Sequence, residues 1–320
     1  MIPQKMSFSN IKYLSVLLFV YSFTGFSQDY TRVDETIKLY PETFNSAEEL
    51  SFFITRDFTS EEDKVRAMYS WMLANIEYDP EEYNKFDYSF KNYRERNEKE
   101  EKVRQKIIKR TLKTGKAVCE GYAMLFEKLC ELQGISSYLV RGDVKSNFDD
   151  IGRPFKNKHM WNVIIINTKP YLFDATWGAG KWGGTSFIKE PDYFYYKANP
   201  EQLVKTHYPS MEEDTLLKNG SNNKESFAAM PLIIDKQLQL EHIETPKRGF
   251  LNGDEYSNEI PFVINAPAPE TISYLDGNQK KTLLFIKNED SFSFSVPYAG
   301  KAQNILIYFN DQPALAYRIK

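Results

Sequence analysis

Cysteine and histidine are scarce in this sequence, and that scarcity limits the metal sites it can build. The 320 residues include only two cysteines, Cys119 and Cys130, and three histidines. A structural zinc site normally takes four Cys or His ligands. No glycine-rich stretch has the spacing of a phosphate-binding loop. The sequence therefore predicts neither a metal site nor a bound cofactor.

Basic charge is not in excess, and long apolar runs are missing. Lys and Arg number 41 against 44 Asp and Glu, which gives a net charge of −3. A nucleic-acid-binding domain usually carries a basic excess. An apolar run over residues 13–23 has 11 residues, and a membrane-spanning helix needs about 20. We therefore expect no nucleic-acid partner.

Residues 1–27 are predicted to form a signal peptide. Lys5 and Lys12 supply positive charge at or before the apolar run, and the small residues Gly25 and Ser27 follow it as a signal peptidase requires. An uncleaved anchor is the alternative. We expect an exported protein, periplasmic or extracellular, that does not associate with the membrane once the signal is removed.

Three patterns divide the rest of the chain. Apolar residues at helical spacing over 61–76 and 119–132 are followed, beyond Gly134, by short strand-like runs. The charged stretch over 81–113 is typical of a solvated helix face. From about residue 231, short strands separated by Gly, Pro and Asn indicate a β-sandwich. We predict an N-terminal extension over 28–59, an α+β domain over 60–218 and a β-sandwich over 225–320.

The two cysteines are predicted to be free. They lie 11 residues apart on one predicted helix, which places their Cα atoms about 16 Å apart, too far for a disulfide. Cys130 lies between leucines in mid-helix and reads as a small buried residue. Cys119 begins the helix, where backbone N–H groups and the helix dipole lower the pKa of a thiol. Cys119 is thus the candidate nucleophile.

A histidine and an aspartate on neighbouring strands complete a candidate triad. His159 opens the strand-like run to residue 167, and Asp174 lies in the next run, 171–177. A hairpin turn at Asn167 and Thr168 puts the two side chains on one sheet face at a diagonal that they can bridge. Asp174 would then orient His159, and His159 would activate the thiol of Cys119.

Three sequence blocks resemble the transglutaminase-like superfamily, and within it the branch of kyphoscoliosis peptidase and its secreted bacterial relatives. They are GKAVCEGYA at residues 115–123, HMWN at 159–162 and DATWG at 174–178, with weaker likeness over the rest of 60–210. The resemblance implies a papain-like α+β core whose Cys119, His159 and Asp174 act on amide bonds.

The expected function is that of a cysteine peptidase or transglutaminase-like acyltransferase, with a protein or peptide substrate and a thioester intermediate. Whether water or an amine resolves the thioester stays open, as do the substrate and the oligomeric state. The alternative is a non-catalytic binding or scaffold protein. Its α+β core would have no catalytic activity, and the β-sandwich would make the protein–protein contacts.

Further candidates concern the oxyanion site, the walls of the cleft and the remaining histidines. The backbone N–H of Cys119 would supply one oxyanion donor, and either Tyr78 or Trp71 could supply the second. Trp161 and Trp177 flank the triad residues as cleft walls or as core. The two remaining histidines are expected to be structural, because no carboxylate or thiol lies at a comparable register: His207 and His242.

Overall fold

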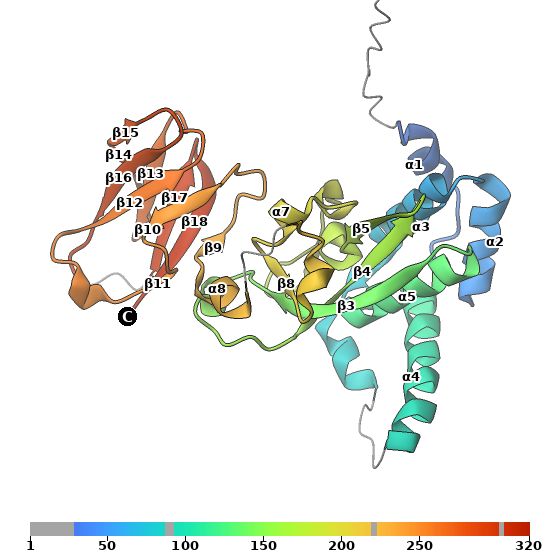
Figure 1. Ribbon diagram of the computed structural model, residues 1–320. Helices are drawn as coiled ribbons and strands as arrows, with labels where there is room; N and C mark the ends of the chain where they lie inside the picture. Colours follow the sequence, from blue (N-terminus) through green and yellow to red (C-terminus); the bar gives the residue numbers. More distant parts are fainter. Residues whose placement is uncertain (1–28, 87–92, 219–222, 301–303) are drawn as a thin grey trace, which may run out of the picture.

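The computed structural model describes residues 29–86, 93–218, 223–300 and 304–320 (Figure 1). The predicted signal peptide lies outside the described residues. Within the described ranges, no helix is both long and apolar enough to cross a membrane.

The first part of the chain is built on a bundle of helices. Three of them come before the first strand: α1 (Thr31–Ile37), α2 (Ala47–Asp57) and α3 (Glu61–Asn75). The hydroxyl of Ser60 caps α3 by accepting a hydrogen bond from the backbone N–H of Asp63 at 3.1 Å. The buried residues Ile37, Leu50 and Ile54 share one core with α3. The stretch predicted as an extension thus packs into this core.

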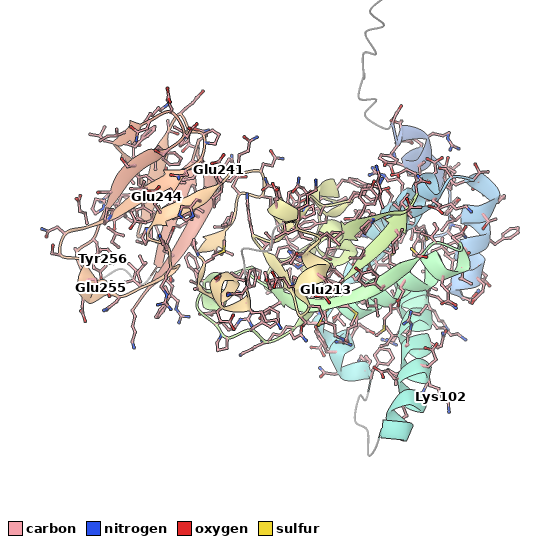
Figure 2. All side chains as sticks on the ribbon, in the orientation of Figure 1. Lys102, Glu213, Glu241, Glu244, Glu255 and Tyr256 are labelled. Carbon is pink, nitrogen blue, oxygen red and sulfur yellow. The ribbon has the colours of Figure 1, made fainter. Side chains whose placement is uncertain are left out.

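Two further helices follow, and they differ in polarity. The helix α4 (Tyr93–Thr114) buries Ile107, Ile108 and Leu112 and exposes Lys102 to solvent (Figure 2). Within the described residues, the part of the charged stretch that belongs to α4 forms a solvated helix face, as predicted. The helix α5 (Cys119–Leu132) is mostly buried, and it begins at Cys119 as the sequence predicts.

A four-stranded antiparallel sheet packs against α5. Its order is β5 (Lys169–Phe173), β4 (His159–Ile166), β3 (Ser137–Val144) and β8 (His207–Pro209). Asn167 and Thr168 form the predicted turn between β4 and β5, both with positive φ. The strand ends at Phe173, however, so Asp174 does not lie in a strand as expected but caps the next helix, α6 (Ala175–Ala179).

The remaining elements of this part are short. They are β1 (Glu77–Tyr78), η1 (Pro80–Lys85), β2 (Lys116–Ala117), η2 (Phe148–Asp150), β6 (Gly180–Trp182), β7 (Phe187–Lys189), η3 (Tyr193–Tyr195), α7 (Pro200–Leu203), η4 (Glu212–Thr215) and α8 (Lys224–Ala229). β1 pairs in parallel with β2, so that Tyr78 lies beside Ala117, two residues before Cys119.

The C-terminal part is a β-sandwich that lies at the opposite end of the molecule from helices α1 to α5 (Figure 1). One sheet has the order β10 (His242–Thr245), β12 (Glu259–Asn265), β16 (Phe292–Pro297) and β15 (Phe285–Lys287). The other has the order β11 (Phe250–Leu251), β18 (Gln312–Ile319), β17 (Asn304–Phe309), β13 (Ile272–Asp276) and β14 (Gln279–Leu283), with β9 (Leu232–Ile233) paired to β18 and η5 (Gly253–Glu255) near its edge.

The sandwich has a hydrophobic core of its own. Phe262 stacks on Phe294 from one sheet and meets Tyr317 from the other edge-on, with ring centroids 4.9 and 5.1 Å apart. The predicted fold class, an α+β core followed by a β-sandwich, is confirmed.

Polar contacts tie the connecting segment, residues 230–238, to the first part. The buried ammonium of Lys145 donates to the carbonyl of Met230 at 2.5 Å, and that of Lys205 donates to Leu238 at 2.7 Å. A small apolar cluster joins Ile151 to Leu232 and Ala316. The two parts therefore share contacts beyond the chain that connects them.

Candidate active site

Cys119 lies at the N-terminus of α5, at the positive end of the helix dipole. Val118 precedes the helix without a side-chain cap, and the first N–H groups of a helix have no partner within it. Their dipoles point toward the position of the sulfur and stabilise negative charge there. Cys119 is 3% exposed, and both cysteines are free.

Cys130 contrasts with Cys119 although both belong to α5. It is fully buried in the apolar core, and this burial raises the pKa of its thiol well above the ordinary range. The expectation that Cys130 is a buried residue without a partner thiol is confirmed.

His159 and Asp174 meet directly. The Nε2–H group of His159 donates to Oδ2 of Asp174 at 2.6 Å. This contact uses one ring nitrogen and leaves Nδ1 as the nitrogen available to the thiol, and His159 does interact with Cys119. Burial opposes the charged imidazole, but the carboxylate outweighs it and raises the pKa of His159 to about 10.

The carboxylate of Asp174 is held by four hydrogen bonds. Its Oδ1 accepts from the backbone N–H groups of Thr176 at 2.8 Å and Trp177 at 3.0 Å. Its Oδ2 accepts from His159 and also from Nε2–H of His207 at 3.0 Å. Although burial would raise the pKa of Asp174, the two histidines hold it well below its ordinary value. Asp174 is therefore ionised in the folded protein.

The position of His207 corrects the sequence-based expectation. His207 was expected to lack a carboxylate partner, yet it shares that of Asp174. Its place follows from β8, whose pairing with β3 sets His207 opposite Val144, while β4 sets His159 opposite Gly142. Only the pairing of β8 with β3, which spans more than 60 residues of sequence, reveals this contact. In the sequence, only the run HYP over residues 207–209, within the region of weaker family likeness, pointed to this segment.

A tyrosine that the sequence analysis did not select lies beside the sulfur. The hydroxyl of Tyr83, in η1, is 3.6 Å from Sγ of Cys119. Burial and then the charge of Cys119 raise the pKa of Tyr83. The predicted candidate Tyr78 also lies near Cys119. Burial raises the pKa of Tyr78, and the charge of Cys119 raises it further. Both hydroxyls are therefore protonated donors near the thiol.

Trp71 is corrected as an oxyanion candidate. Its indole N–H donates to the carbonyl of Pro41 at 2.9 Å, and its ring packs on Phe44 in the helical core. Because this N–H is already engaged, Trp71 has no donor to offer at the thiol.

The other two tryptophan candidates, Trp161 and Trp177, do lie at the site. Trp161 stacks on His159, with centroids 5.9 Å apart and planes 29° apart, and is 2% exposed. Trp177 is half-buried. Its ring is tilted against that of His159, with centroids 6.2 Å apart, and it meets the ring of His207 edge-on, with centroids 4.5 Å apart. Trp161 is therefore core, whereas Trp177 is a half-buried ring that packs against both histidines.

A pocket of about 370 Å³ opens onto the thiol and the imidazole. Charged and polar side chains surround its mouth, and its lining consists of Tyr83, Cys119, Glu120, Arg141, Asn157, Lys158, His159 and Met160. A substrate carbonyl could reach Cys119 and His159 from this side, while Asp174 stays buried behind them.

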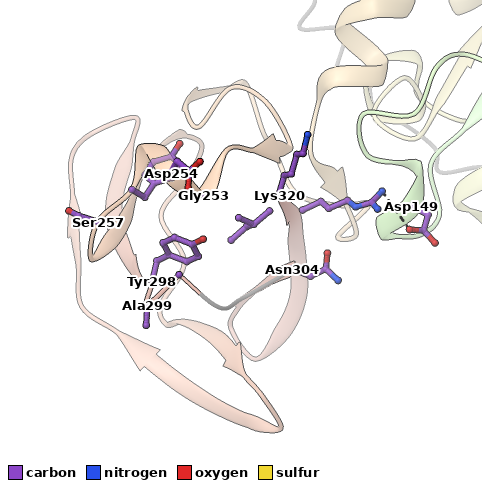
Figure 3. Close-up of a pocket in the computed structure, with 12 residues that line it drawn as sticks. Asp149, Gly253, Asp254, Ser257, Tyr298, Ala299, Asn304 and Lys320 are labelled. Atoms are coloured by element: carbon purple, nitrogen blue, oxygen red, sulfur yellow. Dashed lines mark ion pairs between the residues drawn. The ribbon is translucent and has the colours of Figure 1, made fainter.

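A larger pocket, of about 890 Å³, lies at the edge of the β-sandwich (Figure 3). Asp149, from η2, faces it and pairs with Arg318 of β18 at 3.6 Å. Neither cysteine and no histidine lines this pocket. It therefore offers no counterpart to the chemistry of the pocket at Cys119.

Among the described residues, one group has the composition of a metal site: His159, Asp174 and His207. Two ligands on one tetrahedral zinc ion lie roughly 3.3 Å apart. Here the nitrogen and oxygen atoms are 2.6 and 3.0 Å apart, as in hydrogen bonds. Shared protons account for these contacts better than a metal ion does.

Known proteins with similar sequences match this chain over the site. The family model of the transglutaminase-like superfamily matches residues 48–177. Kyphoscoliosis peptidase of Mus musculus is 28% identical over 249 residues, which is 75% of this chain and 34% of the relative. The Homo sapiens protein is 28% identical over 241 residues, 70% and 32% of the two chains. Hillarin of Drosophila melanogaster is 26% identical over 129 residues, 36% and 16%.

The chain thus spans about a third of the length of the kyphoscoliosis peptidases. A solved structure described as a TGase aligns at 19% identity with a TM-score of 0.27, over 55% of this chain and 38% of that one. The family model covers the segment that carries Cys119, His159 and Asp174, and two relatives align over 70% or more of the chain. Residues 48–177, which carry Cys119, His159 and Asp174, are thus similar to the transglutaminase-like superfamily.

Proposed function

We propose that this protein is an exported cysteine enzyme that transfers acyl groups from amide or peptide bonds of a protein substrate. The proposal rests on one observation above all: Cys119 and His159 line the same pocket, and His159 is hydrogen-bonded to the ionised Asp174. Export is proposed from the pattern of residues 1–27 alone.

The first step forms a thioester. The thiolate of Cys119 attacks the substrate carbonyl carbon, a C–S bond forms, and the carbonyl electrons move onto oxygen. The electrons then return, the C–N bond breaks, and the imidazolium of His159 gives its proton to the leaving nitrogen. Asp174 keeps the ring oriented and stabilises its positive charge.

The second step releases the acyl group. Water or an amine attacks the thioester while His159 accepts its proton, and the C–S bond breaks to restore the thiolate. The oxyanion would be stabilised by the backbone N–H of Cys119 and by the hydroxyl of Tyr83, which lies 3.6 Å from the sulfur. Tyr83 thereby becomes the leading candidate for the second donor.

The first experiment compares the two thiols in the folded protein. Iodoacetamide at pH 6 should modify Cys119 well ahead of Cys130, because only Cys119 has a cation and a helix terminus beside it. His159→Ala should slow the alkylation of Cys119, and Cys130→Ser is the matched control that should not. Mass spectrometry of the modified peptides gives both rates in one sample. Equal rates for the two cysteines would contradict the proposal.

The second experiment asks which bond is broken. The full chain is incubated with a casein substrate with and without a fluorescent primary amine. Peptide hydrolysis creates new N-termini, deamidation of glutamine releases ammonia, and transamidation releases ammonia and attaches the amine. Cys119→Ser should abolish every product, whereas Cys130→Ser should retain them. Products that persist in Cys119→Ser would assign them to another protein in the preparation.

A further inference from the structure

His207 contributes to the site in a way that a Cys-His-Asp triad does not require. Oδ2 of Asp174 accepts two ring N–H groups, one from His159 at 2.6 Å and one from His207 at 3.0 Å. With the two backbone N–H groups on Oδ1, every acceptor direction of this carboxylate is occupied. The carboxylate thus has no freedom to rotate away from His159.

The protonation state of His207 follows from its partners. A carboxylate only accepts, so Nε2 of His207 carries a proton, and its Nδ1 accepts from the hydroxyl of Thr206 at 2.8 Å. Burial lowers the pKa of His207 against the opposing influence of Asp174, and the charges of His159 and Lys236 add to the lowering. A neutral imidazole with one fixed tautomer results.

The surroundings fix the ring in place. Gly142 and Val144 lie two residues apart on β3, so their partners His159 and His207 point to the same face of the sheet. A Cβ atom at Gly142 would come within 2.3 Å of the ring of Trp161 and of the carbonyl of Tyr208. Glycine is therefore needed for this packing.

Aromatic rings close the remaining sides of His207. Trp177 meets its ring edge-on at 4.5 Å and Trp161 at 5.5 Å, and Tyr195 lies at 5.8 Å. Water is thereby kept from Asp174, whose side chain is fully buried. In such a dry site, an unpaired carboxylate oxygen is costly, and the carboxyl group protonates more easily.

We propose that His207 is a positioning residue of the reaction, which holds Oδ2 of Asp174 in place for His159. This inference rests on the proposed function, because it assumes that Asp174 and His159 serve the thiol of Cys119. His207 touches neither the thiol nor the substrate pocket. It acts only through Asp174.

The test uses the alkylation rate of Cys119 in the full chain, measured from pH 4 to pH 8, with Cys130 as the internal reference. His207→Phe fills the space without a donor, and His207→Gln keeps an N–H donor. His242→Gln is the matched control, because His242 is exposed on β10. We expect His207→Phe to slow alkylation at pH 6 about tenfold, the effect of one lost hydrogen bond to a charged group.

The pH profile separates positioning from packing. In His207→Phe the acid limb of the profile should move to higher pH, because Asp174 protonates more readily without this donor. His207→Gln should restore most of the rate and the position of the limb, and His242→Gln should match the wild type. Thr206→Val keeps the imidazole of His207 but removes the hydroxyl that fixes its tautomer. We expect an intermediate alkylation rate for this variant, and it provides a second test if His207→Phe does not fold.

The outcomes separate the two proposals. Wild-type rates and pH profiles in His207→Phe and Thr206→Val, together with slow alkylation in His159→Ala, would overturn the role of His207 alone. An equal loss in His207→Phe and His207→Gln, with no shift of the acid limb, would reduce His207 to a packing residue. Alkylation that is as fast in His159→Ala as in the wild type would overturn the proposed function as well.

Discussion

At the scale of single residues, Tyr83 and Tyr78 provide two hydroxyls near one sulfur, and their geometry separates them. Tyr83 approaches Sγ of Cys119 to 3.6 Å from a 3-10 turn, whereas Tyr78 is placed by its pairing in β1 beside Ala117. Tyr83 also lines the pocket at Cys119, and Tyr78 does not. Tyr83 is therefore the hydroxyl that a bound carbonyl would meet.

Removing the hydroxyl of Tyr83 should slow turnover but leave the reactivity of the Cys119 thiol toward iodoacetamide unchanged. For Tyr83→Phe we expect a fall in kcat of roughly 100- to 1000-fold, as one oxyanion donor is lost, while alkylation of Cys119 changes little. Tyr78→Phe is the matched control, with near wild-type kcat. The casein assay and the iodoacetamide assay measure the two quantities, and a larger loss in Tyr78→Phe would reverse the assignment.

His159 also makes stability depend on pH. Its pKa of about 10 in the folded protein exceeds the value of about 6.5 in an unfolded chain. The folded state then binds more protons between these values, so the stabilisation is complete below pH 6.5 and is lost as pH rises toward 10. Urea denaturation should show that the wild type loses its advantage over His159→Gln in this range. A constant difference would contradict the His159–Asp174 ion pair.

At the scale of elements, the hairpin of β4 and β5 sets the register of the site. Asn167 and Thr168 have φ values of +49° and +68°, as a two-residue turn with the twist of the strands requires. The ladder that this turn begins ends at the pair Asn162 and Phe173. Asp174 follows at once and reaches His159, so a slip of one residue would turn it to the other face.

The turn carries one residue that does not suit it. A β-branched residue such as Thr168 is strained at positive φ, and glycine is not. We expect Thr168→Gly to raise the free energy of unfolding by about 1 kcal/mol. Thr114→Gly, at the end of α4, is the control and should lower it by a similar amount. Urea denaturation measures both, and a loss of stability in Thr168→Gly would show that the turn is not strained.

At the scale of the whole molecule, buried lysines connect the two parts. Lys145 lies on the first part, next to β3, and its ammonium donates to Met230 just before the sandwich begins, 5.0 Å from the ring of Phe227. Burial lowers the pKa of Lys145 to about 7. The unfolded chain, with a lysine pKa of about 10.4, binds more protons above pH 7.

Stability should therefore rise with pH through this group. Between pH 7 and 10 the wild type should gain stability relative to Lys145→Met. Lys102→Met, on the exposed face of α4, is the control. Its free energy of unfolding should change with pH in the same way as that of the wild type. Chemical denaturation at pH 7 and pH 9.5 gives the comparison. If Lys145→Met followed the wild type at both pH values, the ammonium would not be buried at the junction.

Much of this arrangement follows from local sequence. The helix start at Cys119, the turn at Asn167 and the short strands after residue 231 depend on neighbours within a few residues, and the sequence predicts them. The three sequence blocks also contain Cys119, His159 and Asp174, and the contact between His159 and Asp174 follows from the hairpin that the sequence predicts.

Contacts between distant segments were decided only by the tertiary structure. His207 reaches Asp174 because β8 pairs with β3, Tyr83 reaches Cys119 through the turn after β1, and Trp71 turns to Pro41 in the core. Spacing in the sequence determines which residues share a face of a helix or strand. It does not determine which of two faces, or which distant segment, a side chain meets, since that choice is made by the packing of the whole core.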